Sequence, residues 1–387
     1  MIFLEYILGG LACLSCALAI WQWLAARQFP LHRKIAVPGY APAVSILKPL
    51  KGCDETTSAS LASWFQQEYA GPIEIIFGVA DARDPVCTVV REVMARHPSV
   101  PARLIVCENL SGTNAKMAKL AQLEKLAAHP LILISDADVR VPPFFLASFV
   151  APLRDEKNAL VNCFYRLANP STAAMRWEAV AINADFWSQV LQSQTLKPLD
   201  FALGAAIVLR RPALAQIGGF AALADCLADD YQLGHRIARN GHRIALCPLV
   251  VECWDSPQTW RQVWKHQIRW ARTIRVCQPG PYFSSIIANA GFWATVWFIA
   301  AMVAGNFVAA ALAAALLVIR TLIALRLQKR FTPGNSLVSP FWLVPLRDWL
   351  NAAIWCCAFL GNTVEWRGRR MRVRRDGVLV GISSASQ

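Results

Sequence analysis

Residues 131–143 read LILISDADVRVPP, an apolar run of strand length followed at once by two aspartates one residue apart. A loop after a strand often carries aspartate because the carboxylate accepts hydrogen bonds from backbone N–H groups. Carboxylates are also the ligands that Mg²⁺ and Mn²⁺ prefer. Taken alone, Asp136 and Asp138 favour the plain turn, so the surrounding chain has to decide between the two interpretations.

The chain around this motif alternates between short apolar runs and helical patterns. The expected strands are Val44–Leu47, Ile73–Val79, Arg103–Val106 and Leu131–Ser135, and the expected helices are Thr56–Gln67, Pro85–Arg96 and Asn114–Ala128. This rhythm predicts βαβ units and an α/β fold with a doubly wound, mostly parallel sheet. Ligands of such sheets bind at the carboxyl ends of the strands. Because Asp81 follows one expected strand and Asp136 another, a nucleotide-and-metal site is at least as well supported as two helix caps.

Two common phosphate-binding motifs are absent from the turn after the first expected strand. The residues there read LKPLKGCDE and contain neither GxGxxG nor GxxxxGK[ST]. Dinucleotide-binding and P-loop functions therefore lose support.

The composition predicts a soluble domain joined to a few membrane segments. The 387-residue chain is 56% hydrophobic and 17% charged, with a mean hydropathy of +0.36. Its net charge is +14, and the basic residues flank apolar stretches. That distribution indicates anionic membrane lipids as partners, and no nucleic acid. The twelve cysteines form no disulfide framework and indicate scattered thiols in a reducing compartment.

The first membrane segment runs from Ile2 to Trp23, which is long enough for a bilayer core. Basic residues follow it at Arg27, Arg33 and Lys34, and none precedes it. This charge order predicts an uncleaved anchor, residues 1–25, with the next domain on the cytoplasmic side. That catalytic domain is expected to span residues 37–280.

A second apolar block, Tyr282–Ile319, would be roughly 57 Å long as one helix, nearly twice the thickness of the bilayer core. We expect two helices that turn near Gly305–Asn306, after which Arg320, Arg326, Lys329 and Arg330 return the chain to the cytoplasm. The stretch Phe341–Leu360 contains Pro345, Arg347 and Asp348. We expect an interfacial or re-entrant helix there, because a full crossing would export an arginine-rich tail. The membrane region is thus placed at 282–363 and a basic cytoplasmic tail at 364–387.

Two further strings lie between the sheet and the second membrane block. One is GGFAALADCLADDYQLG, residues 218–234, with adjacent aspartates at 229 and 230. The other is WKHQIRWARTIR, residues 264–275, with Arg269 followed by Trp270. Acidic residues are ordinary in a first helical turn, and Trp with Arg is ordinary at a membrane boundary. Their order along the chain is what carries information.

The order Asp, Asp-x-Asp, Asp-Asp-Tyr and then IRW before a membrane helix resembles the D, D, D, (Q/R)xxRW motifs of membrane-bound family 2-like glycosyltransferases. It is most similar to glycosyltransferase family 21, the ceramide glucosyltransferases, and to the related bacterial hopanoid glycosyltransferases. Supporting strings are LKPLKG at 47–52, GTNAKMAKL at 112–120 and WRGRRMRV at 366–373. One departure is His266, which stands where the family has Gln or Arg, while Gln267 lies one place out of register.

The resemblance implies a GT-A fold, a nucleotide-sugar donor, a divalent cation (Mg or Mn) and a lipid hydroxyl acceptor. Asp138 is the expected metal ligand, with Asp136 sharing the ion or holding the donor ribose. A metal ion stabilises the diphosphate leaving group without proton transfer. Asp81 is expected to contact the nucleotide, and Lys116 its phosphates.

The acceptor alcohol needs a general base, for which Asp230 is the candidate, with Asp229 beside it. Inverting displacement at the sugar is implied by the resemblance. Arg269 is expected to pair with the diphosphate, Trp270 to wall the acceptor, and His266 to contribute to donor binding.

The resulting hypothesis is a multi-pass membrane enzyme, in a bacterial inner membrane, that transfers glucose from UDP-glucose to ceramide. Transfer of N-acetylglucosamine from its UDP donor to a hopanoid alcohol stays open, because both activities share these motifs. A non-catalytic membrane-anchored module and a metal-dependent phosphotransferase or nuclease are remote alternatives. A processive polysaccharide synthase is disfavoured because so few membrane segments leave little to build a channel.

Overall fold

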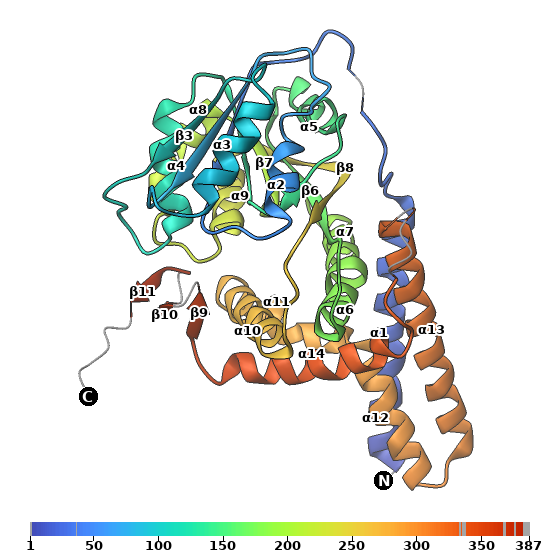
Figure 1. Ribbon diagram of the computed structural model, residues 1–387. Coiled ribbons are helices and arrows are strands. Elements are labelled where there is room, and N and C mark those ends of the chain that lie inside the picture. The colour runs from blue at the N-terminus through green and yellow to red at the C-terminus, as the bar shows by residue number, and fades with distance from the viewer. Residues whose placement is uncertain are drawn as a thin grey trace, which may run out of the picture.

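The computed structural model describes residues 2–35, 37–332, 334, 338–366, 369–374 and 377–381. Figure 1 shows an α/β domain above a platform of helices, with a bundle of long helices extending away from it on one side. A small sheet near the C-terminus lies beside the platform at the opposite end from that bundle (Figure 1).

One half of the main sheet is parallel. Its strands are β1 (Val44–Pro49), β2 (Ile73–Val79), β3 (Ala102–Val106) and β4 (Leu131–Ser135), in the spatial order β3-β2-β1-β4. The connecting helices are α2 (Thr57–Ala62), α3 (Val86–Arg96) and α4 (Ala115–Leu126). The four predicted strands are therefore confirmed. Helix α2 is shorter than the expected Thr56–Gln67, because the chain passes into turns after Ala62.

The other half continues from β4 with mixed pairing. Its strands are β5 (Val139–Arg140), β6 (Asn158–Leu167), β7 (Ala206–Arg210) and β8 (Arg243–Cys253), and the full eight-stranded order is β3-β2-β1-β4-β7-β6-β8-β5. Strand β7 is antiparallel to β4 and β6, whereas β6 and β8 are parallel. The helical elements here are α5 (Phe145–Val150), η1 (Ala151–Arg154), α8 (Arg211–Gln216), η3 (Phe220–Leu223) and α9 (Asp229–Arg239). The predicted mostly parallel α/β sheet is confirmed.

The sheet is covered on both faces, which explains why its central strands read as apolar runs. Along β1, Ile46 belongs to the cluster on one face and Leu47 to the cluster on the other. Ile132 and Leu133 of β4 divide between the same two clusters. Successive side chains of a strand point to opposite faces, so each strand contributes to both cores.

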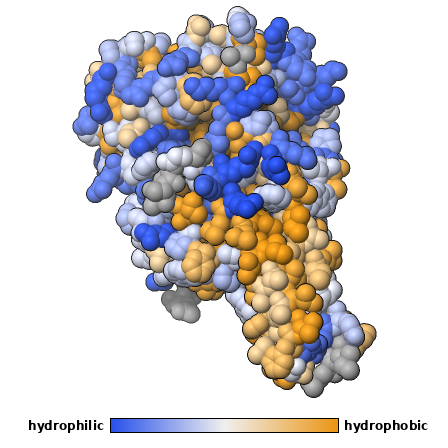
Figure 2. Space-filling model, turned by 90° about the vertical axis from the view of Figure 1, so that its right-hand side faces the viewer, coloured by the Kyte–Doolittle hydropathy of each residue, from blue (hydrophilic) through white to orange (hydrophobic). Residues whose placement is uncertain are grey.

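The helical bundle consists of α1 (Ile2–Gln28), α12 (Ala290–Val303) and α13 (Phe307–Phe331). Helices α1 and α13 are long and apolar enough to cross a membrane; a bent pair formed by 279–288 and 290–303 could supply a third span. The predicted turn at Gly305–Asn306 is confirmed, because both residues lie between α12 and α13. Figure 2 shows that the bundle is mainly hydrophobic on its surface, in contrast to the α/β domain.

The platform links the bundle to the α/β domain. It contains α6 (Ala173–Val180), the π-helix η2 (Ala181–Phe186), α7 (Trp187–Gln194), α10 (Trp260–Cys277), α11 (Pro279–Ser284), η4 (Ser285–Ala288) and α14 (Leu343–Phe359). Helix α14 covers most of the stretch 341–360, and it runs across the direction of α1 and α13 (Figure 1). This orientation supports the interfacial interpretation, and the predicted segment boundaries stay predictions.

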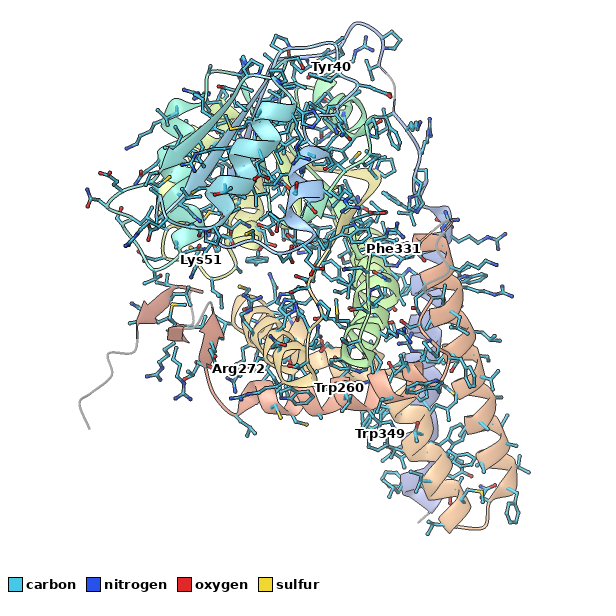
Figure 3. The ribbon with its side chains drawn as sticks, viewed as in Figure 1. Tyr40, Lys51, Trp260, Arg272, Phe331 and Trp349 are labelled. Carbon is cyan, nitrogen blue, oxygen red and sulfur yellow. The ribbon has the colours of Figure 1, made fainter. Side chains whose placement is uncertain are left out.

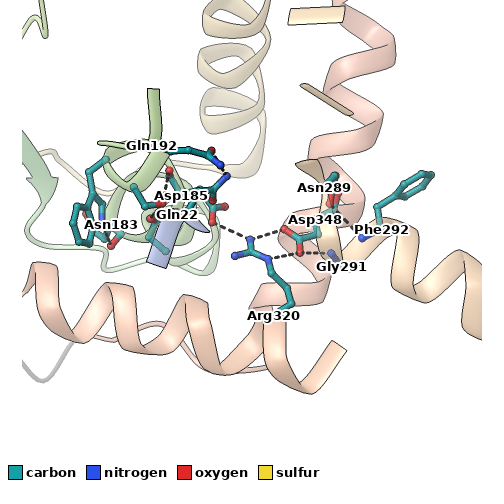
Figure 4. Close-up of polar contacts among 12 residues, drawn as sticks. Gln22, Asn183, Asp185, Gln192, Asn289, Gly291, Phe292, Arg320 and Asp348 are labelled. Atoms are coloured by element: carbon teal, nitrogen blue, oxygen red, sulfur yellow. Dashed lines mark hydrogen bonds and ion pairs between the residues drawn. The ribbon is translucent and has the colours of Figure 1, made fainter. Parts of the chain in front are cut away.

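Arg320 was expected to follow the apolar segment, and the helix instead continues past it to Phe331. Arg320 is buried within α13 and forms a two-pronged ion pair with Asp348 of α14, at 2.8 and 2.9 Å. The same guanidinium reaches Asp185 of η2 at 2.9 Å (Figure 4). Arg326 and Arg330, farther along the helix, are exposed. The partners of Arg320 lie 28 and 135 residues away along the chain, so no local pattern indicates these ion pairs.

The C-terminal sheet consists of β9 (Thr363–Trp366), β10 (Arg369–Val373) and β11 (Leu379–Gly381), in the antiparallel order β11-β10-β9. It occupies the stretch for which the sequence indicated only a basic tail. Met371 and Val373 are buried, while Arg370 and Arg372 are exposed on the alternate positions. Arg367 and Arg375, which were counted with the tail, lie outside the described residues.

Candidate active site

Lys116 connects two aspartates that are far apart in the sequence. Its Nζ atom lies 2.7 Å from Asp136 Oδ1, in the loop after β4, and 3.3 Å from Asp229 Oδ2, at the start of α9. The lysine side chain is 12% exposed and that of Asp136 is 41% exposed. Burial alone would lower the pKa of Lys116, but the two carboxylates raise it above its ordinary value. Lys116 therefore stays a cation between the two motifs.

The N-terminus of α4 sets the position of this lysine. Asn114 caps the helix, because its side chain accepts hydrogen bonds from the backbone N–H groups of Lys116 and Met117. Its amide group donates to the carbonyl of Cys226 at 2.8 Å. Asn114 is fully buried, so one residue both begins the helix and ties it to the loop that precedes Asp229.

The two aspartates of the Asp-x-Asp motif lie in different surroundings. Asp136 is half-exposed and paired with Lys116. Burial, with the nearby carboxylates of Asp136 and Asp255, raises the pKa of Asp138 to about 7. The backbone around the motif is fixed, because the carbonyl of Asp138 accepts a hydrogen bond from the N–H of Trp254 at 3.1 Å. A carboxylate with a pKa near 7 gains from a cationic neighbour such as a metal ion.

A second lysine, Lys48, contacts the backbone of the Asp-x-Asp motif. It was not among the predicted site residues. Lys48, near the end of β1, is fully buried, and its Nζ donates to the carbonyl of Asp136 at 2.6 Å. The ammonium also lies 4.6 Å from the ring centroid of Trp64. Burial lowers the pKa of Lys48 to about 7. The sequence did contain a signal for this residue, because a lysine within a mostly apolar strand, in LKPLKG, is unusual.

Asp230 lies next to the lysine-bridged pair. Burial, followed by the adjacent carboxylate of Asp229, raises the pKa of Asp230 to about 6. Gly204 packs against it, and a Cβ atom at that position would lie only 2.7 Å from Asp230 Oδ2. The structure thus brings together Lys116, Asp136, Asp229 and Asp230, all of which belong to predicted motifs.

The predicted IRW motif lies on α10, which begins with a capping box at Thr259. His266 Nδ1 and Gln267 Nε2 both lie 2.8 Å from Oε1 of Glu178, a buried residue of α6. Trp270 packs edge-on against His266, with the ring centroids 4.4 Å apart, and near Phe186 of η2. Glu178 has no motif of its own in the sequence, so sequence inspection missed its role in holding this helix.

Asp81 lies apart from the cluster around Lys116. It follows β2, two strands from β4 in the sheet, and its carboxylate binds the backbone N–H and the guanidinium of Arg83 at 2.9–3.2 Å. Both side chains are well exposed. The structure leaves this carboxylate at the edge of the site, and a nucleotide contact there stays a prediction.

The carboxylates of Asp136 and Asp138 fit a divalent cation that takes its remaining ligands from a substrate and water. Within the described ranges, no cluster of three or more His, Cys, Asp or Glu side chains could enclose a metal ion. Asp136 and Asp138 therefore offer one or two carboxylates and no complete cage. Mg²⁺ is commonly held in this way, by one or two carboxylates together with phosphate oxygens and water.

Figure 3 shows the relation of the site to the platform. Lys51, in the loop after β1, lies on the side of the α/β domain that faces α10, where Arg272 and Trp260 are labelled (Figure 3). The loops that follow the parallel strands therefore open toward the helix that carries Arg269 and Trp270.

The chain is similar in sequence to a known family and to several curated proteins. The sequence model of glycosyl transferase family 21 matches residues 8–379. Ceramide glucosyltransferase 3 of Caenorhabditis elegans is 25% identical over 226 residues, which is 58% of this chain and 48% of that protein. Ceramide glucosyltransferase of Komagataella phaffii is 28% identical over 148 residues, 34% of this chain and 29% of that protein. The chain thus spans about half the length or less of these curated relatives.

Among solved structures, a mannosyltransferase from Pyrobaculum calidifontis, in complex with GDP-mannose and Mn²⁺, has a TM-score of 0.54 and 19% sequence identity. The match covers 92% of this chain and 98% of that one. At this identity the likeness concerns the fold, and it confirms the predicted GT-A type architecture.

Proposed function

The chain belongs to glycosyl transferase family 21 and is a glycosyltransferase, and from that premise we propose that it transfers glucose from UDP-glucose to the hydroxyl group of ceramide. The observation that carries the proposal is the bridge made by Lys116 between Asp136 and Asp229, at 2.7 and 3.3 Å. Asp136 is expected to bind the nucleotide-sugar donor, and Asp229 lies beside the expected base, Asp230. One lysine side chain contacts both Asp136 and Asp229, so the expected donor and acceptor sites are neighbours.

On the donor side, Asp136 and Asp138 would hold a divalent cation together with the diphosphate. When bound, that ion would offset the negative charge that develops on the departing UDP. Lys116 and Arg269 add fixed positive charge for the same phosphates. Lys48 keeps the Asp136 backbone in place through its 2.6 Å hydrogen bond.

On the acceptor side, Asp230 accepts the proton of the attacking hydroxyl. Its raised pKa, about 6, leaves it ionised at neutral pH yet more basic than an ordinary aspartate. A single base and in-line attack on an α-linked donor give inversion and a β-glycoside. Trp270 provides an apolar surface on the platform side, where a lipid arrives.

The membrane helices deliver that lipid. We propose that α1 and α13 cross a bacterial inner membrane, that α14 lies at its surface, and that the α/β domain is cytoplasmic. Exposed arginines of β10, Arg370 and Arg372, then contact anionic lipid head groups.

Glycolipid synthesis by the purified, detergent-solubilised protein tests this function. UDP-glucose and UDP-N-acetylglucosamine are each supplied with ceramide or with a hopanoid alcohol, in the presence of Mn²⁺ or Mg²⁺. We expect glucosylceramide, a loss of product in Asp230→Asn, and no loss in Asp155→Asn, a matched change in an exposed loop. UDP binding, measured by calorimetry, checks that Asp230→Asn is folded.

The outcomes separate the alternatives. Product from the hopanoid pair alone would replace the substrates but keep the enzyme class. Failure of every pair, in folded protein that also does not bind UDP, would contradict UDP-sugar binding and overturn the proposed reaction. Product formation that persists in Asp230→Asn would remove Asp230 as the base.

A further inference from the structure

The C-terminal sheet is attached to the segment that precedes the base. The N–H of Leu379 donates to the carbonyl of Asp225 at 2.7 Å, and the N–H of Leu227 donates to the carbonyl of Gly377 at 3.2 Å. Cys226 and Val378 form an isolated antiparallel bridge between these two bonds. Residues 224–228, hereafter the 224–228 loop, are therefore paired with the C-terminal sheet directly before Asp229 and Asp230.

The same sheet is attached to α10. Lys265 forms a 2.7 Å ion pair with Glu365 of β9, and Arg275 donates to the carbonyl of Gly361, two residues before β9, at 3.2 Å. Arg272 donates to the carbonyl of Thr363. Apolar contacts support these bonds, because Leu227 and Val276 pack on the buried side chains of the sheet. Arg269 lies on the same helix, between Lys265 and Arg272.

The 224–228 loop is also tied to the helix that carries Lys116. Asp225 accepts hydrogen bonds from the N–H of Thr113 at 2.8 Å and from its hydroxyl at 3.1 Å. The N–H of Asn114 donates to the carbonyl of Ala224 at 2.7 Å. Gly112 permits this close approach, since a Cβ atom there would lie 2.6 Å from the Ala224 oxygen and the residue has φ +96°.

We infer that Asp225 is a positioning residue, and that the C-terminal sheet with the 224–228 loop sets the spacing of Lys116, Asp230 and Arg269. Three helices carry these groups, and each is bonded to the loop or to the sheet. The inference rests on the proposed function, in which Asp230 is the base and Lys116 and Arg269 face the phosphates.

The chemistry depends strongly on such spacing. In-line attack requires the base, the hydroxyl and the sugar–phosphate bond to be aligned, and a misplacement of about 1 Å can cost about 10²-fold in rate. Asp225 itself is exposed, so its removal takes little from the core. A loss of rate that exceeds the loss of stability would therefore report on alignment.

Comparison of Asp225→Ala with Asp225→Asn tests the inference. Asparagine keeps an oxygen that accepts from the N–H of Thr113, whereas alanine keeps none. We expect Asp225→Ala to lower kcat on the order of 10-fold or more. UDP binding and thermal stability should stay close to those of the starting protein. Amide hydrogen exchange should become faster in peptides that cover residues 225–231 and 377–379. Asp225→Asn should recover most of the rate. The matched control is Asp155→Ala, which removes a carboxylate that accepts from the N–H of Lys157 in another exposed loop.

Two results would overturn the inference. One is an Asp225→Ala enzyme with the kcat and the hydrogen exchange of the control. The other is an Asp225→Asn enzyme as slow as the alanine variant. Should Asp225→Ala fold poorly, Thr113→Val removes only the 3.1 Å hydroxyl contact and should give a smaller loss of kcat in the same direction; an unchanged kcat there would count equally against the inference. Failure of the proposed function is distinguishable, because the unaltered protein would then form no product from any donor–acceptor pair, whereas failure of this inference leaves that activity intact.

Discussion

Two lysine- or arginine-centred groups, each joining two aspartates, are built differently in this protein. At the sheet edge, Lys116 joins Asp136 and Asp229 through a single ammonium group, and Asp136 remains 41% exposed. At the platform, Arg320 joins Asp348 and Asp185 through a planar guanidinium, and these three side chains are 5–14% exposed. The first arrangement leaves carboxylate oxygens that a ligand can reach, whereas the second is closed.

The closure of the Arg320 group has further support from its neighbours. Asp348 also accepts the N–H of Gly291 at 3.1 Å, and its carbonyl accepts the side chain of Asn289 at 2.8 Å (Figure 4). A bidentate pair with its remaining acceptor positions filled is suited to joining helices. A lysine bridge can exchange its partners for phosphate oxygens. We conclude that the two groups differ in whether a ligand can reach their carboxylates. The Lys116 group is accessible and suits a binding site, whereas the Arg320 group is closed and joins helices.

The largest expected effect on this comparison comes from Lys116→Met. Removal of the ammonium group takes away a positive charge expected to face the departing diphosphate and should lower kcat about 10²–10³-fold. Steady-state transfer of glucose to ceramide measures it. The matched control is Lys125→Met, an exposed lysine of the same helix, which should keep its rate. Equal rates in the two variants would contradict the placement of Lys116 in the site.

Arg320→Met should act on stability and not on chemistry. It leaves two buried carboxylates without their cation, a change that typically costs about 3–5 kcal/mol of unfolding free energy. Chemical denaturation in detergent, followed by circular dichroism, measures the loss. Arg326→Met, an exposed position of the same helix, is the control and should stay near the starting stability. A stable Arg320→Met protein with a low kcat would instead move this group into the site.

The dependence of kcat on pH should be smaller than the effects of Lys116→Met and Arg320→Met. Asp230 must be ionised to accept a proton, and its pKa is raised to about 6, so kcat should fall about tenfold for each pH unit below 6 and level off above it. A pH–rate profile measures this, and the residual activity of Asp230→Asn should lack that limb. Because the folded-state pKa lies above the ordinary value, the folded protein binds this proton more tightly. This group's contribution to stability therefore grows as pH falls through 6.

Local patterns in the sequence were enough to predict the parallel half of the sheet. The runs that form β1, β2 and β4 are buried on both faces, and Asp136 and Asp138 follow β4 as the doubly wound arrangement requires. Lys116 could be predicted because it belongs to the GTNAKMAKL string. Periodicity within a segment carries this information, since it depends only on residues near one another.

The other parts depended on partners far away along the chain. Glu178 meets His266 across 88 residues, and Thr113 meets Asp225 across 112. No local pattern specifies such pairs. The C-terminal sheet did have a local signal, the alternation of arginine with Met371 and Val373, but its high charge favoured a tail. The ion pairs of Arg320 likewise depend on Asp348 and Asp185, which lie 28 and 135 residues away along the chain.

The smallest expected effect concerns the departure from the family motif at His266. His266→Gln introduces the family residue, whose amide can donate to the Glu178 oxygen that now lies 2.8 Å from the ring Nδ1. The change should leave kcat and the KM for the nucleotide sugar within about threefold, because a hydrogen-bond donor to the same Glu178 oxygen is kept. The contrasting variant is Gln267→Leu, which removes the other donor to the same buried oxygen and should cost about 1–3 kcal/mol of stability. If His266→Gln instead lost activity on the scale of Lys116→Met, the imidazole itself would take part in the reaction, and the site would extend along α10 to Glu178.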